Sequence, residues 1–326
     1  MRLLRRLLLT TSLFAVCMNA FPSTEDKNPP IKIIVGFSPG GTSDVVARVL
    51  AEDLRVELKR NVIVENKPGA IGRIAAQSML NSSADGSTYL FSPDSWAIFP
   101  TLMLTSESLK YNYHKDFKTV AKVISYPLGL YAGKSAGVSN FEELLEKARK
   151  DSKYTFYAAT GTGGVTEFLG IVLSKKIGVK MITVPYKGAA GVKNALLGYE
   201  AMSGIMAPGD LSGLIKDGHL IPLGMMSKNR WSVMPDVPTM LEQGYDITQG
   251  EAFMGLWASA KTNDSEINKM EEAIKKIVST EKFKNKMIQA SVYPDFMGSK
   301  ELAKEIEDLI AFWKPVVEDS GYSLNK

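Results

Sequence analysis

Residues 31–50, IKIIVGFSPGGTSDVVARVL, predict a buried strand, a glycine-rich loop and the start of a helix. The β-branched run at 31–35 is typical of a strand, and SPGG at 38–41 disfavours both helix and strand. From Thr42 onward, apolar residues recur at helical spacing. The first N–H groups of a helix have no partner within it and lie at the positive end of its dipole. We therefore expect this loop to hold an anion, specifically a carboxylate.

Residues 154–174 repeat this order of elements. The strand-like YTFYA at 154–158 is followed by TGTGG at 160–164 and then by a helical pattern. The glycines at 40 and 41 alone could serve a left-handed turn without any ligand, but the second loop favours anion binding. Strands and helices alternate along the rest of the chain, which predicts parallel sheets covered by helices. Since ligands of such sheets lie beyond the carboxyl ends of the strands, the two loops are expected to face each other across a cleft.

A crossing between two domains is expected near residues 120–132, an apolar and extended segment interrupted by Tyr126-Pro127. The 326 residues suffice for two domains of ordinary size. We expect domain 1 to comprise residues 28–124 and 249–326, and domain 2 to comprise residues 125–248.

The N-terminus has the pattern of a signal peptide. Three arginines, the apolar segment 7–16 and a cleavage position at Ala20 predict a signal peptide over residues 1–20 and export to the periplasm. The apolar segment is too short to be a permanent membrane span. A lipid anchor at Cys17 is the less favoured alternative, because Val16 is a poor residue at that place. Cleavage would leave a chain without cysteine, which excludes disulfides and thiolate metal sites.

Composition gives little support for nucleic-acid binding or catalysis. The net charge of +4 falls to +1 without the three N-terminal arginines, so no basic surface for nucleic acid is expected. The two histidines, His114 and His219, stand alone in polar contexts and are expected at the surface. The chain contains neither a G-x-S-x-G elbow nor an H-E-x-x-H motif. We expect no enzyme, no metal and no cofactor.

A series of short motifs runs through the chain in a fixed order. They are FSPGGTSDVVAR at 37–48, VENKPGAIG at 64–72, DG at 85–86, TGTG at 160–163, VPYKG at 184–188, VPT at 237–239 and EQG at 242–244. This ordered set resembles the tripartite tricarboxylate transporter substrate-binding proteins, also called the Bug family of periplasmic receptors. The resemblance covers nearly the whole chain after the signal peptide.

The resemblance implies a type II periplasmic-binding fold, in which two doubly wound α/β domains are joined by crossover strands around a ligand cleft. It implies that two glycine-rich loops hold one carboxylate, largely through backbone N–H groups and ordered water. The ligand-binding residues implied by position are Phe37, Ser38, Gly40, Gly41, Thr42 and Asp44 in the first loop, Thr160, Gly161 and Thr162 in the second, and Ser92, Asp94 and Ser95 at the distal part of the ligand.

Two of the candidate side chains, Asp44 and Tyr186, have more than one interpretation, and a third, Asp94, bears on the charge of the ligand. Asp44 either complements the helix dipole or orients the loop, because a carboxylate does not bind an anion directly. Tyr186 is either plain cleft wall or a hydroxyl within reach of the ligand. Asp94 is expected to repel a second carboxylate, which favours a ligand with a neutral or amine-bearing distal end.

The function expected from these features is a monomeric periplasmic receptor that captures a small organic carboxylate and delivers it to a membrane permease. One alternative is a secreted hydrolase of a carboxylate or phosphate ester, with Asp44 or Asp94 as the base. Another is a sensory module that presents its ligand to a membrane kinase. No nucleic-acid partner is expected.

Overall fold

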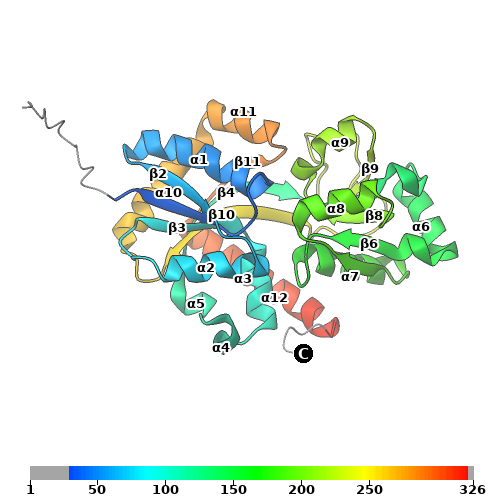
Figure 1. Cartoon of the computed structure of the whole chain (residues 1–326), viewed down its shortest axis with the longest axis horizontal. Helices are drawn as coiled ribbons and strands as arrows, with labels where there is room; N and C mark the ends of the chain where they lie inside the picture. Colours follow the sequence, from blue (N-terminus) through cyan, green and yellow to red (C-terminus); the bar gives the residue numbers. More distant parts are fainter. Residues whose placement is uncertain (1–28, 322–326) are drawn as a thin grey trace, which may run out of the picture.

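Two β-sheets, each in its own lobe, organise the computed structural model, which describes residues 29–321 (Figure 1). The signal peptide expected over residues 1–20, with Cys17, lies outside the described residues. Within residues 29–321, no helix has both the length and the apolar character that a membrane crossing requires.

The first lobe contains both ends of the described chain. Its strands are β1 (Ile31–Val35), β2 (Val62–Asn66), β3 (Thr88–Pro93), β4 (Phe117–Pro127), β10 (Glu251–Ser259) and β11 (Tyr293–Gly298). Its helices are α1 (Thr42–Leu58), α2 (Arg73–Leu80), α3 (Ser95–Met103), α4 (Ser106–Leu109), α5 (Tyr113–Asp116), α10 (Asp264–Ser279), α11 (Glu281–Gln289) and α12 (Ser299–Asp319), with a 3-10 turn η1 (Ala70–Gly72).

The second lobe is formed by the middle of the chain. Its strands are β5 (Gly129–Gly133), β6 (Phe156–Ala159), β7 (Ile182–Pro185), β8 (Ser203–Met206) and β9 (Leu220–Met225). Its helices are α6 (Phe141–Lys150), α7 (Val165–Ile177), α8 (Gly188–Leu197) and α9 (Ser212–Lys216), with 3-10 turns η2 (Lys134–Ala136), η3 (Ser152–Thr155) and η4 (Pro208–Asp210).

The two sheets share one topology. The first has the order β11-β4-β10-β3-β1-β2 and the second the order β7-β6-β8-β5-β9. In each, three strands are parallel, and the next strand is antiparallel and follows a segment of the opposite lobe, β10 in the first sheet and β5 in the second. β1 and β6 hold corresponding central places. The expected repeat of the strand, loop and helix at 31–50 by residues 154–174 is therefore confirmed.

The lobes are joined by continuous strands. β4 ends at Pro127 and β5 begins at Gly129, so Leu128 alone separates a strand of one sheet from a strand of the other. The chain returns along β10, which enters the first sheet at Glu251 and pairs with β4 along its length. Figure 1 shows β10 extending from the first lobe toward the second. The expected division into residues 28–124 with 249–326 and residues 125–248 remains a prediction.

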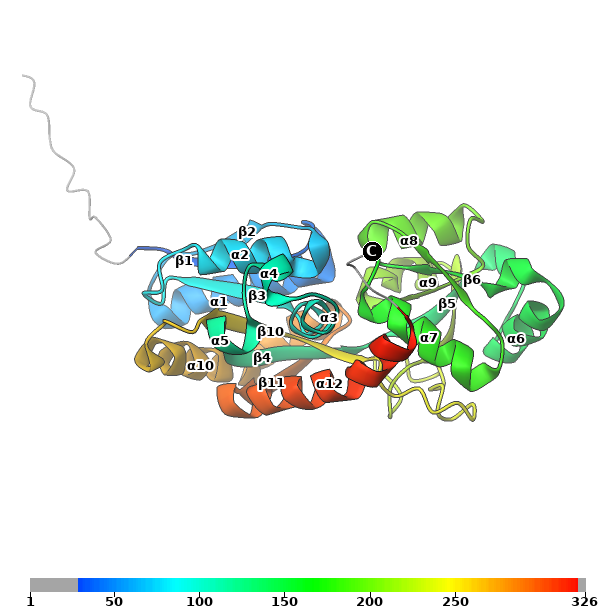
Figure 2. The ribbon, with the colours of Figure 1, turned by 90° about the horizontal axis from the view of Figure 1, so that it is seen from below.

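The C-terminal helix α12 also bridges the lobes. It runs beneath the first sheet and ends against α7 of the second lobe (Figure 2). Phe99 of α3 stacks on Phe168 of α7 with ring centroids 5.0 Å apart, and Trp313 of α12 packs edge-on against Phe99 at 5.3 Å. The ion pair between Lys175 and Asp319, at 3.3 Å, adds a contact between α7 and α12.

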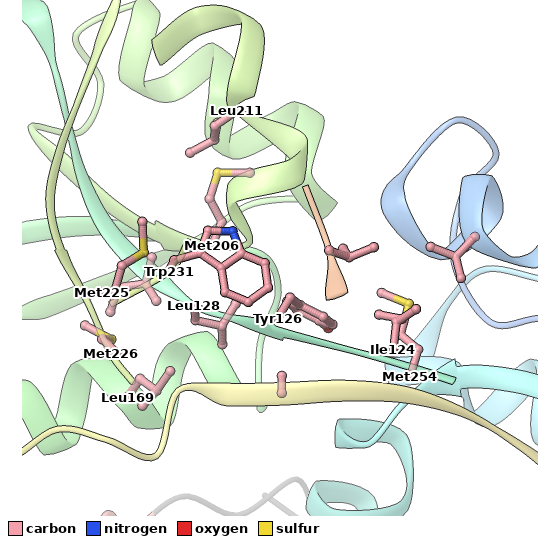
Figure 3. Packing of buried hydrophobic residues seen from close by; sticks show 14 of the residues in the cluster. Ile124, Tyr126, Leu128, Leu169, Met206, Leu211, Met225, Met226, Trp231 and Met254 are labelled. Carbon is pink, nitrogen blue, oxygen red and sulfur yellow. The ribbon is translucent and has the colours of Figure 1, made fainter. Parts of the chain in front are cut away.

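The hydrophobic core runs without a break through the crossing. Tyr126 and Leu128 lie between Ile124 and Met254 of the first lobe and Met206 of the second (Figure 3). Apolar side chains therefore pack around the crossing strands and connect the cores of the two lobes.

Candidate functional site

A cavity of about 300 Å³ lies between the two lobes. Its lining comprises Phe37, Ser38, Pro39, Gly40, Gly41, Thr42, Ser43, Pro93 and Ser95 from the first lobe, Tyr126, Leu128 and Met254 from the crossing strands, and Thr160, Val165, Thr166, Lys187, Gly188, Ala189, Ala190, Lys193, Met206 and Ala207 from the second lobe. Much of this lining follows the carboxyl ends of parallel strands in both sheets, where ligands of open α/β sheets bind.

Three helices begin at the cavity without a side-chain cap. The N-cap residues are Gly41 for α1, Gly164 for α7 and Lys187 for α8, and none provides a side-chain acceptor. The backbone N–H groups of the lining residues in these first turns therefore lack an acceptor among the described residues. These residues are Ser43, Val165, Thr166, Ala189 and Ala190.

Several helices away from the cavity are capped in the usual way. The side chains of Thr105, Asn112, Asn140 and Thr280 accept a backbone N–H at the starts of α4, α5, α6 and α11. The starts of α2, α10 and α12 also lack a side-chain cap, so what distinguishes α1, α7 and α8 is their position at the cavity wall. A bound anion would satisfy their free N–H groups, and the helix dipoles there also favour negative charge.

An acidic side chain fixes the first glycine-rich loop. The N–H of Gly40, whose φ of +80° is left-handed, donates to the Asp44 carboxylate at 3.0 Å. Arg48 Nε donates to the same oxygen at 3.0 Å, and an Arg48 terminal nitrogen lies 2.9 Å from the other. Burial alone would raise the pKa of Asp44, but the hydrogen bonds from Arg48 and Gly40 outweigh it and hold the pKa below its ordinary value. Asp44 is thus an ionised support of the loop.

The second loop is built in the same way. The N–H of Gly163, with a φ of +71°, donates to the Glu167 carboxylate at 2.6 Å. Glu167, like Asp44, is the third residue of its helix, and burial raises its pKa although the Gly163 N–H opposes that rise. The Thr160 N–H donates to the Thr166 hydroxyl at 3.1 Å, so this amide is already used within the loop.

Comparison with known proteins identifies the group to which this architecture belongs. Residues 46–322 match the family model described as "Tripartite tricarboxylate transporter family receptor". The chain belongs to this family. The protein BugT of Bordetella pertussis is 28% identical over 322 residues, which cover 98% of each chain.

Solved structures share the fold of this family receptor. The periplasmic binding protein BugD superposes with a TM-score of 0.81 at 26% identity, covering 91% of this chain and 99% of BugD. An R. palustris protein solved with adipate superposes with a TM-score of 0.84 at 22% identity, covering 90% and 98% of the two chains. The resemblance seen in the sequence motifs and the expected two-lobed, type II-like fold are both confirmed.

About half of the residues implied by the motifs line the cavity of this family receptor. Those on the lining are Phe37, Ser38, Gly40, Gly41, Thr42, Ser95 and Thr160. Those outside it are Asp44, Ser92, Asp94, Gly161, Thr162 and Tyr186. As ligand contacts, these residues remain predictions.

Asp94 lies below the cavity rather than on its wall. It is 6% exposed, and its carboxylate accepts the Ser95 N–H at 2.8 Å at the start of α3. Burial raises the pKa of Asp94 to about 7, with Ser95 and Lys122 lowering it and Glu305 raising it. The expectation that Asp94 repels the distal end of a ligand therefore loses its structural basis, because the carboxylate is used to cap α3.

Ser92 and Tyr186 also lie outside the cavity lining; the Tyr186 hydroxyl has a partner, whereas the buried Ser92 hydroxyl has none among the described residues. The Ser92 hydroxyl is fully buried beneath the first loop, where a Cβ added to Gly72 would lie 3.4 Å from it. The Tyr186 hydroxyl donates to Glu200 at 3.1 Å. Both residues support the walls of the cleft instead of lining the cavity.

Sequence reasoning missed the part of the cavity formed by α8. Lys187 is solvent-exposed, and it lines the cavity together with Ala189, Ala190 and Lys193. The signal was available, since Lys187 lies two residues after the end of the strand at 182–185 and the same end-of-strand rule had selected the two glycine-rich loops. Lys193 follows Ala189 by one helical turn.

The site offers little for catalysis. Both carboxylates considered as a base are engaged, Asp44 with Gly40 and Arg48 and Asp94 with Ser95. The two histidines lie at the surface as expected: His114 is 45% exposed and contacts Glu307 at 2.9 Å, and His219 is exposed. Among residues 29–321, no group of three or more His, Cys, Asp or Glu side chains could hold a metal ion.

Proposed function

We propose that this receptor captures a small organic carboxylate between its lobes in the periplasm and delivers it to a membrane permease. One observation carries the proposal. The uncapped starts of three helices and two lysines meet at one cavity, and no acidic residue is among the lining residues whose side chains are described.

The electrostatics of this arrangement favour an anion over a neutral ligand. Each helix start contributes about half a positive charge and unpaired N–H donors. Such donors form stronger hydrogen bonds to a charged carboxylate than to a neutral carbonyl. A carboxylate placed between the starts of α1 and α7 would contact both lobes at once, and so would stabilise the arrangement in which the lobes are close together.

The size of the cavity and the properties of relatives agree with this proposal. A cavity of about 300 Å³ is at the small end of ligand pockets. The family is described as a receptor of tripartite tricarboxylate transporters, BugD as a periplasmic binding protein, and the R. palustris neighbour was solved with adipate. We propose that the permease recognises the closed form, which a hinge at the crossing strands would produce.

A thermal-shift screen of small organic acids, followed by calorimetry, tests the proposal. We expect one or more acids to raise the melting temperature and to bind saturably, while their methyl esters do not. A screen in which the esters bind as tightly as the acids would overturn it. Product formation, followed by NMR in the same samples, would instead support the hydrolase. For the sensory alternative, co-purification with a membrane kinase rather than a permease is the distinguishing result.

A further inference from the structure

Two lysines on the wall of the cavity have no partner. Lys187 precedes α8, and Lys193 lies within that helix, one turn after Ala189, on the cavity wall. Neither forms an ion pair or hydrogen bond with any described residue. Lys193 is half-buried, so its ammonium group has less access to water than that of a surface lysine.

The position of these two lysines near the start of α8 makes their unpaired positive charge unfavourable when no ligand is bound. Cations near the N-terminus of a helix are destabilised by the helix dipole. The carboxylates of Asp44 and Glu167 bind the glycine loops and that of Asp94 caps α3, and none of the three pairs with either lysine. The second lobe thus holds a positive patch on the α8 side of the cavity, and nothing in the described protein neutralises it.

A ligand with a single carboxylate would leave this patch unpaired. In the proposed function, one carboxylate lies between the starts of α1 and α7. The α8 wall belongs to a different helix and presents Ala189 and Ala190, whose small side chains leave room for a further ligand group. A second acidic group on the ligand would meet the lysines and the uncapped N–H groups of α8 together.

We propose that Lys193, assisted by Lys187, selects ligands that carry a second negative charge at the end distal to the glycine-rich loops. This inference rests on the proposed function and adds the residues that read the distal charge. It replaces the expectation, drawn from Asp94, of a neutral or amine-bearing distal end.

The expected ratio of the two affinities, dicarboxylate over monoamide, follows from one hydrogen bond between charged groups. A hydrogen bond between charged groups in a partly buried site changes affinity by about 10- to 100-fold. We therefore expect a dicarboxylate to bind about 10- to 100-fold more tightly than its monoamide, which has the same length and shape but one charge less.

Calorimetry with succinate, glutarate and adipate, each compared with its monoamide, tests the inference on the full-length mature protein. The wild-type protein is expected to prefer the dicarboxylate of at least one length by the factor given above. Lys193→Met should reduce this preference to about threefold or less while retaining the affinity for the monoamide. The matched control is Lys180→Met, which removes an exposed lysine of the same lobe outside the cavity and should leave the preference unchanged.

The possible outcomes separate the two proposals. A wild-type protein that binds dicarboxylates and monoamides equally, or a Lys193→Met variant with an unchanged preference, would overturn the inference and leave the carboxylate receptor standing. Failure of the wild-type protein to bind any of these acids, together with failure of the wider acid screen, would overturn the proposed function and this inference with it. Retained affinity for the monoamide in Lys193→Met excludes misfolding as the cause of a lost preference.

Discussion

The backbone N–H of Gly40 donates a hydrogen bond of 3.0 Å to the carboxylate of Asp44. The same relationship joins Gly163 and Glu167 in the other lobe at 2.6 Å. In both lobes the acceptor is the third residue of a helix, and the donor is a left-handed glycine just before the N-cap. The arrangement is related to a capping box, but it reaches one residue further back. Each acidic side chain therefore fixes the loop that precedes a helix start at the cavity.

Removal of Asp44 should loosen the first loop and weaken ligand binding. We expect Asp44→Ala to lower the affinity for a carboxylate at least tenfold and to reduce the free energy of unfolding by about 1.5–3 kcal/mol, because the hydrogen bonds of the charged carboxylate with Gly40 and Arg48 are lost. Calorimetry and thermal melting measure the two effects. The control is Asp53→Ala. Asp53 lies on α1, as Asp44 does, but outside the cavity, and its replacement removes an ion pair with Lys282 of α11. Equal affinities for the two variants would contradict a supporting role for Asp44.

A side chain at Gly41 should block the cavity without unfolding the protein. The φ of Gly41 is −82°, which other residues adopt, and an added Cβ would lie 3.6 Å from the Ser38 carbonyl oxygen, an ordinary contact. Since Gly41 lines the cavity, we expect Gly41→Val to lower affinity at least 100-fold while melting remains cooperative. Gly213→Val, at an open position away from the cavity, serves as the control. Unchanged affinity in Gly41→Val would remove the first loop from the site.

The fold was largely accessible from the sequence because its repeating unit has strong local signals. The β-branched strand at 31–35, the glycine-rich loop after it and the helix from Thr42 appear in the structure with these starts. The chain crossing was expected from the apolar segment 120–132, and the structure has β4 and β5 there. Local periodicity and turn chemistry are sufficient for such elements, since each is determined by nearby residues.

The elements that sequence reasoning missed have weaker local patterns. Helix α3, at 95–103, is apolar on nearly all sides and contains Pro100, so it has no polar stripe from which a helix could be recognised. Strand β11, at 293–298, carries Pro294 and pairs irregularly with β4 at the edge of the sheet. The strand expected from residue 154 begins at Phe156, because the four residues before it form the turn η3.

The site was predicted less completely than the fold. The two glycine-rich loops were found, because a glycine-rich turn between strand and helix is visible in the sequence. The direction of an individual side chain depends on tertiary packing, which is why Asp94 was expected in the cavity and lies below it. The α8 wall was missed because Lys193 belongs to no motif, and because the VPYKG motif that contains Lys187 does not by itself show that α8 faces the other lobe.

The stack of Phe99 on Phe168 should couple the stability of the two lobes. Both rings are buried, and they join α3 of the first lobe to α7 of the second. We expect Phe168→Ala to reduce the free energy of unfolding by about 3–5 kcal/mol. We also expect calorimetric unfolding to broaden or split, because the lobes then unfold more independently. Phe283→Ala, a buried residue within the first lobe, should cost a similar amount and keep one transition. A single sharp transition for Phe168→Ala would contradict the coupling.

Asp94 should make the stability of the protein depend on pH with an unusual sign. Burial raises the pKa of its carboxyl group from an ordinary value of 3.8 to about 7. Between these two values the folded protein retains a proton that the unfolded chain has released, so the free energy of unfolding falls as the pH rises. The loss is complete above about pH 7 and amounts to about 4 kcal/mol at most.

Asp94→Asn isolates this contribution, because the amide oxygen can still accept the Ser95 N–H but cannot ionise. We expect the variant to lose less stability than the wild-type protein between pH 5 and pH 8, as measured by urea unfolding at both pH values. Asp85→Asn is the matched control. The Ser87 hydrogen bonds hold the pKa of Asp85 below its ordinary value, so this group is ionised in both states throughout the window and its removal should change stability equally at pH 5 and pH 8. If Asp94→Asn and the wild-type protein show the same pH dependence, the buried carboxyl group titrates near its ordinary value and the cap of α3 is charged throughout.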